Sequence, residues 1–116
     1  MGSDTNLFSY NIEVISDELH VRGEILTKLL KNFSHTLVQN LFLLDAAMAG
    51  GDTAQMLAIL HVVKGTAGNL RLKRIHDSSG EMHDAVEAAA PHEHVNTLFQ
   101  VFKDESLAFV RFAKTL

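Results

Sequence analysis

The amino-acid sequence predicts an all-α protein, an antiparallel up-down four-helix bundle with an additional N-terminal helical segment. Two observations support this prediction. The 116 residues contain 1 proline and 7 glycines, whereas an all-β domain of this length would need many more turn residues. Apolar residues also recur every three or four positions through four long segments, which is the spacing of amphipathic helices.

The N-terminal part of the chain is expected to hold a tail, a short helical segment and the first long helix. Residues 1–6 are interpreted as a disordered tail or a cloning remnant, and the bundle domain is expected over 7–116, starting with a helical segment at Leu7–Leu19. The first long helix is expected over His20–Ala49, with an interruption near Ser34. Its core side is predicted to consist of Leu26, Leu29, Leu30, Phe33, Leu37, Leu41, Leu44 and Met48.

Three further helices are expected after short connections. Gly50-Gly51 ends the first long helix, and Asp52 caps the second, which is expected over Thr53–Leu70. The third helix is expected over Leu72–Ala89 and the last, which follows the single proline, over His92–Lys114. The last helix is predicted to offer the core Val95, Leu98, Phe99, Phe102, Leu107, Phe109, Val110 and Ala113.

Composition disfavours several classes of function. The sequence has no cysteine, which excludes disulfides, thiolate metal sites and cysteine nucleophiles and favours a reducing, cytoplasmic location. The net charge of -4 argues against general binding to nucleic acid. We expect no membrane contact, because no apolar stretch approaches the length of a membrane helix. Neither a phosphate-binding glycine loop nor a Gly-x-Ser-x-Gly motif occurs, so a stand-alone enzyme is disfavoured.

The second helix is expected to carry small residues on the side that faces away from the core. At about 100° per residue, His61 lies opposite the core stripe and points toward solvent. Gly65 and Gly68 lie near it, although each glycine costs a helix about 1 kcal/mol relative to alanine. We expect the two glycines to leave a low surface over which another protein reaches the imidazole. The core stripe is predicted to be Met56, Ile59, Val63, Ala67 and Leu70.

Basic residues gather after this histidine, in a stretch that has no Asp or Glu between Asp52 and Asp77. A basic patch on an acidic protein suggests an acidic partner or a phosphoryl group, and chance clustering explains the charges equally well. Imidazole is a nucleophile, and an ammonium group one turn away can pair with a phosphoryl oxygen. The pattern suits a phosphoryl carrier. The basic residues are Lys64, Arg71, Lys73 and Arg74.

The segment His61-Val-Val-Lys64-Gly65-Thr-Ala-Gly68-Asn69-Leu70 resembles the signature of histidine-containing phosphotransfer (HPt) domains, H-x-x-K-G followed by small residues. Gly23–Phe33 and Ala46–Asp52 are similar to the first long helix and the following turn of that family, so the resemblance extends over nearly the whole chain. It implies a four-helix bundle in which His61 is phosphorylated, and in which Lys64 and Gly65 flank the phosphoryl group. Arg71 departs from the pattern, because many members of the family have glycine there.

The resemblance also implies partners. A response-regulator receiver domain would dock over the second helix, and a sensor histidine kinase could supply the phosphoryl group. The domain itself would need no nucleotide or other cofactor, because Mg²⁺ is expected on the receiver. We expect either a free-standing protein or part of a hybrid sensor kinase. Gly68 is expected to support the phosphoryl site, and the docking residues are expected to be Leu57, Ala58, Arg71, Lys73 and Arg74.

Two alternative functions remain open on the sequence alone. One is a helical adaptor that keeps the bundle without carrying phosphate, and the less favoured one is a histidine-rich metal-binding bundle. His76 and His83 lie seven residues apart on one expected helix, and His92 and His94 start the last. Neither pair has the i, i+4 spacing that holds one ion between two histidines, so we predict no metal site.

Overall fold

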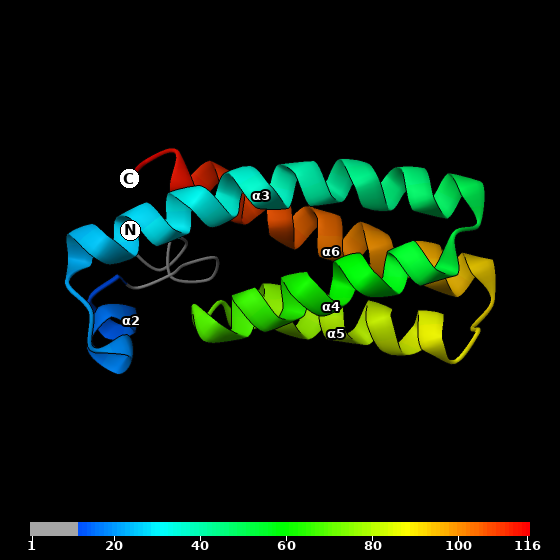
Figure 1. The fold of residues 1–116 in the computed structure, drawn as a ribbon, viewed down its shortest axis with the longest axis horizontal. Helices are drawn as coiled ribbons and strands as arrows, with labels where there is room; N and C mark the ends of the chain where they lie inside the picture. Colours follow the sequence, from blue (N-terminus) through cyan, green and yellow to red (C-terminus); the bar gives the residue numbers. More distant parts are fainter. Residues whose placement is uncertain (1–11) are drawn as a thin grey trace.

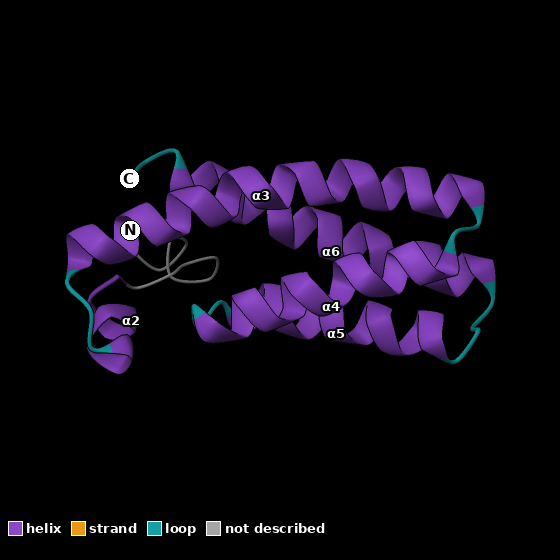
Figure 2. Cartoon of the chain, in the orientation of Figure 1, coloured by secondary structure: helices purple, strands orange, loops and turns teal. Residues whose placement is uncertain are grey.

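Helices make up nearly all of the chain in the structure, a computed structural model that describes residues 12–116 (Figures 1 and 2). The predicted tail at 1–6 and the start of the predicted N-terminal segment, 7–11, lie outside the described residues. The helices are α2 (Ile12–Leu19), α3 (Gly23–Gly50), α4 (Thr53–Asn69), α5 (Lys73–Glu87) and α6 (His92–Ala113).

The four long helices run alternately up and down and pack side by side (Figure 1). Each contacts its two neighbours around the bundle, because α3 packs against α4 and α6, and α5 packs against the same two helices from the opposite corner. The short helix α2 packs against α3. The predicted four-helix bundle with an added N-terminal helix is therefore confirmed.

Four helix ends share one backbone turn, which explains most of the errors in the predicted boundaries. A residue in the left-handed conformation follows each helix, and the amide after it donates to a carbonyl five residues back, as Leu72 does to Ala67. Glycine is the residue that usually occupies such a position, but here only one of the four is glycine. The four residues are His20, Gly51, Arg71 and Ala89.

The corrected boundaries follow from these turns. His20 was predicted to begin the first long helix but belongs to the turn before it, since its φ of 56° is left-handed. Ala89 was predicted inside the third helix, which ends at Glu87 because the backbone turns there. The predicted interruption near Ser34 is wrong, because α3 runs through it without a break and the serine is buried.

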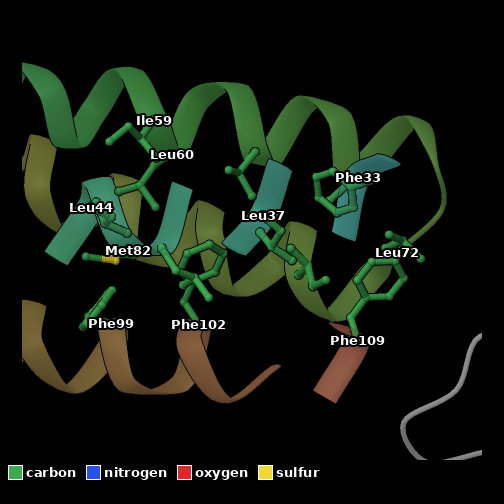
Figure 3. Close-up of a cluster of buried hydrophobic side chains, with 14 of the residues drawn as sticks. Phe33, Leu37, Leu44, Ile59, Leu60, Leu72, Met82, Phe99, Phe102 and Phe109 are labelled. Atoms are coloured by element: carbon green, nitrogen blue, oxygen red, sulfur yellow. The ribbon is translucent and has the colours of Figure 1, made fainter. Parts of the chain in front are cut away.

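The hydrophobic core lies between α3, α4, α5 and α6 (Figure 3). Leu29 was predicted to belong to it but is 41% exposed, because it lies at the edge of α3. Conversely, Leu60, absent from the predicted stripe of α4, is fully buried. Because both α3 and α5 cover α4, its buried arc is wider than a single stripe. Fully buried side chains also come from α5, for which no core residues were predicted: Ile75, Ser79 and Met82.

Candidate functional site

His61 lies at the midpoint of α4 and is exposed to solvent. The helix begins at the predicted cap, where the Oδ1 atom of Asp52 accepts a hydrogen bond from the backbone amide of Gln55 at 3.1 Å. Buried residues on the other side hold α4 in the bundle and so fix the direction in which His61 points. These residues are Met56, Ile59, Leu60, Val63 and Ala67.

The neighbours of His61 are set by the way α4 and α5 pair. Three contacts share one antiparallel register: Gly68 opposite His76, Lys64 opposite Gly80, and the His61 ring opposite the His83 ring. Each step of four or three residues back along α4 is matched by an equal step forward along α5. We call this line of contact the α4–α5 seam, and the candidate site lies along it.

Lys64 is held in place by a glycine on the neighbouring helix. A β-carbon placed on Gly80 would lie 3.3 Å from Cε of Lys64 and 3.6 Å from its Nζ, so the lysine stem occupies the space that a side chain would fill. The Lys64 side chain is half-buried, and it forms no ion pair with any residue of 12–116. The site therefore offers a positioned cation one helical turn from His61.

The two glycines of α4 differ in their surroundings. Nothing lies within 4 Å of a β-carbon placed on Gly65, which is exposed as the sequence analysis expected. A β-carbon on Gly68 would lie only 3.0 Å from Cδ2 of His76. The expectation that both glycines lie open is therefore wrong for Gly68, because α5 covers that side of α4. Gly68 makes room for a ring of its own protein.

The other basic residues have partners. The Nζ atom of Lys73 donates to Oδ2 of Asp77 at 2.8 Å, and Nη1 of Arg74 lies 3.4 Å from Oε1 of Glu105. The hydrogen bond from Lys73 holds the pKa of the Asp77 carboxyl below its ordinary value, and the same bond raises the pKa of Lys73. Acidic residues thus partly neutralise the basic patch inferred from the sequence. Asp77 lies one helical turn from Lys73, whereas Glu105 is distant from Arg74 in the sequence.

Arg71, where the sequence departs from the expected pattern, lies in the turn that follows α4. Its φ of 62° is left-handed, a conformation that glycine adopts without strain. The arginine side chain folds back over the helix end, where its Nη1 donates to the Gly68 carbonyl at 3.0 Å and its Nε lies 4.0 Å from the Glu18 carboxylate. The Arg71 side chain therefore contacts residues of its own chain.

His83 is the member of the site that sequence reasoning missed. Its ring centroid lies 6.4 Å from that of His61, with the two planes inclined by 49°. Its side chain is 21% exposed, whereas that of Asp84, 3.9 Å from its Nδ1, is 78% exposed. The spacing along the sequence gives no signal of this contact, because the two histidines lie 22 positions apart. Only the register of the α4–α5 seam reveals it.

The predicted docking residues Leu57 and Ala58 lie one turn before His61, where Leu57 is half-buried and Ala58 exposed. On α5, His83, Asp84 and Glu87 place one potential ligand atom each within 4.8 Å of one another, the single such group in residues 12–116. Two of the three are exposed carboxylates, which commonly gather on helices without binding an ion. We assign no metal to them. The histidine pairs considered from the sequence form no such group within the described chain.

Comparison with known proteins gives one match. The family model of the Hpt domain matches residues 28–110, which include all of α4 and α5 and therefore the whole candidate site. Neither the curated proteins nor the solved structures give a significant match. Within the described residues, no helix is long and apolar enough to cross a membrane.

Proposed function

Because this chain belongs to the Hpt domain family, whose members are phosphotransfer carriers, we propose that it carries a phosphoryl group on His61. The observation that supports this most directly is the place of His61: it is exposed at the centre of α4, one turn from Lys64, which forms no ion pair within residues 12–116. The stem of Lys64 packs over Gly80 of α5, which holds this cation on the α5 side of α4. The proposed relay runs between a kinase or receiver aspartate and another receiver.

The proposed transfer needs two groups from this domain, a nucleophile and a cation. In the accepting step, the lone pair of one ring nitrogen of neutral His61 attacks the phosphorus of an aspartyl phosphate. The N–P bond forms as the P–O bond breaks, and the electron pair of the broken bond leaves with the aspartate carboxylate. The donating step is the reverse, toward a second aspartate. Lys64 pairs with the phosphoryl oxygens and stabilises the charge that they carry in the transition state.

The partner would dock over the exposed side of α4. Ala58 and Gly65 keep this surface low on both sides of His61, and the half-buried Leu57 adds an apolar contact. Arg71, Lys73 and Arg74 would act mainly through their long-range field, which speeds association with an acidic receiver. Mg²⁺ on the receiver would offset part of the phosphoryl charge. We infer no nucleotide site in this domain, and the cytoplasmic location expected from the sequence remains part of the proposal.

The test is uptake of phosphate from a receiver domain that carries a radiolabelled aspartyl phosphate. We expect the wild type to acquire a label that acid removes, and His61→Gln to acquire none. His35→Gln removes another exposed histidine, on α3, and should be labelled like the wild type. Label that persists in folded His61→Gln would show that another residue carries the phosphate. A wild type that binds receivers but is never labelled would favour the adaptor function.

A further inference from the structure

His83 faces His61 across the α4–α5 seam, and the carrier chemistry described above makes no use of it. The ring centroids lie 6.4 Å apart. The two rings are too distant for a direct hydrogen bond, because each nitrogen lies only about 1 Å from its centroid and the bond needs about 3 Å between heavy atoms. The gap between the rings leaves room for a group attached to the nitrogen of His61 that is nearer α5.

We propose that His83 is a second contact for the phosphoryl group: its imidazolium form donates a hydrogen bond to the phosphoryl oxygens on His61, so that the domain holds phosphate more tightly as the pH falls. The inference rests on the proposed function, since it requires phosphate on His61. No bond to phosphorus forms at His83. The ring takes one proton from solvent and keeps it while the contact lasts. The phosphoryl group would then meet two cations, Lys64 and His83.

The packing of α5 holds His83 in position for this role. Its side chain is only 21% exposed, so much of the ring's freedom is already lost before the phosphoryl group arrives. Lys64 against Gly80 and His76 against Gly68 fix the register of the two helices on the same seam. The position of the His83 ring therefore follows from helix packing, and His61 is the exposed side chain that faces it.

The charges that face His83 come from α4 and from its own helix. His61 and Lys64 lie across the seam, and on α5 the Oδ1 atom of Asp84 is 3.9 Å from Nδ1 of His83, with the Glu87 carboxylate in the same group. The two carboxylates offset part of the charge that a protonated His83 brings beside Lys64.

Within the described residues, no ion pair joins α6 to His83. Helix α6 packs along α5, and an ion pair joins the two helices between Glu105 and Arg74. Arg74 precedes His83 by nine residues, which places the two side chains about 180° apart around the helix at about 100° per residue. This ion pair therefore lies on the side of α5 away from His83.

The direction of the pH effect follows from linkage. Histidine is the side chain that changes charge between about pH 5 and 8. A hydrogen bond from an imidazolium to a phosphoryl oxygen is charge-assisted and stronger than one from the neutral ring. Because the protonated ring binds the phosphoryl group more strongly, a fall in pH favours the phosphorylated form of the domain. A rise in pH favours loss of the phosphoryl group.

The experiment compares decay of phosphohistidine in matched variants. The full chain is phosphorylated with phosphoramidate, the position of the phosphate is located by mass spectrometry, and its loss is followed at about pH 6 and about pH 8. The variants are His83→Leu, which removes the donor, and His83→Gln, which keeps a neutral one. His35→Gln is the control, because it changes an exposed histidine of α3, a helix outside the seam. Each variant is compared with the wild type at the same pH, since phosphohistidine decay itself depends on pH.

We expect His83→Leu to lose phosphate about fivefold faster than the wild type at the lower pH, the ratio for a contact worth about 1 kcal/mol. The ratio should shrink at the higher pH. His83→Gln should match the wild type at the higher pH and decay faster at the lower, whereas His35→Gln should match it at both.

Decay of both His83 variants at the wild-type rate, or a ratio that is the same at both pH values, overturns this inference alone. The second result would mean that His83 acts only through packing. If His61 takes up no phosphate in the wild type, the proposed function itself fails and the inference falls with it. Far-ultraviolet circular dichroism checks that each variant keeps the helical fold.

Discussion

The two glycines of α4 allow a sharp test of the seam, because they are alike in the sequence and different in the structure. Replacing glycine by alanine in a helix interior gains about 1 kcal/mol in the free energy of unfolding. The Gly65→Ala methyl enters open space, so the variant should realise the whole gain. For a chain of 116 residues this corresponds to a rise of about 4 °C in Tm.

Gly68→Ala should behave differently, because its methyl would lie 3.0 Å from Cδ2 of His76. The ring must retreat by a few tenths of an ångström, and its Nδ1 is held by Oδ1 of Asp77 at 3.1 Å. Overpacking costs about 1–3 kcal/mol, so we expect no net gain or a loss. In a His76→Ala background the conflict disappears, and Gly68→Ala should recover the gain of about 1 kcal/mol.

The assay is thermal and urea unfolding of the wild type, the three single variants and the double variant, analysed as a double-mutant cycle. The cycle should show a coupling between Gly68→Ala and His76→Ala of about 1 kcal/mol or more. Equal stabilisation by Gly65→Ala and Gly68→Ala, or a coupling near zero, would refute the packing of α4 on α5 described above. If Gly65 admits the partner, the more stable Gly65→Ala should also accept phosphate from a receiver more slowly.

Three further predictions concern the chemistry, the core and a helix end. Lys64→Ala should slow phosphate transfer at saturating receiver without abolishing it, since one cation is lost and the nucleophile is kept; an unchanged saturated rate in stopped-flow measurements would make Lys64 a docking residue. Phe102→Ala removes a fully buried ring and should cost about 3–5 kcal/mol in urea unfolding; a loss below about 1 kcal/mol would contradict its burial. Ala89→Gly should raise stability by about 1 kcal/mol, because Ala89 is left-handed; an unchanged or lower Tm would count against that turn.

Much of the fold could be predicted because it depends on local patterns. The three- and four-residue spacing of apolar side chains predicts the four long helices, and Asp52 marks the start of α4 as expected. The errors fall where local rules have exceptions. Glycine predicts the left-handed end of α3, but the same turn at Arg71 and Ala89 is built from residues that rarely adopt it. Sequence rules for helix ends do not detect such turns.

The candidate site was predicted in part. The angle around a single helix places His61 toward solvent and Lys64 beside it, and the structure agrees with both positions. The roles assigned to these residues remain predictions. The same angle placed Gly68 in the open, which is wrong, because an angle around one helix axis does not say which helix covers that side.

The sequence by itself determined the helical class, the amphipathic faces and the H-x-x-K-G segment, because these depend on residues a few positions apart in the chain. Only the tertiary structure decided that His83 faces His61, that Gly80 lies under Lys64 and that Arg74 has an acidic partner in Glu105. The physical reason is the axial register of α5 against α4. That offset is the sum of many weak packing contacts around the core, and no short stretch of sequence contains it.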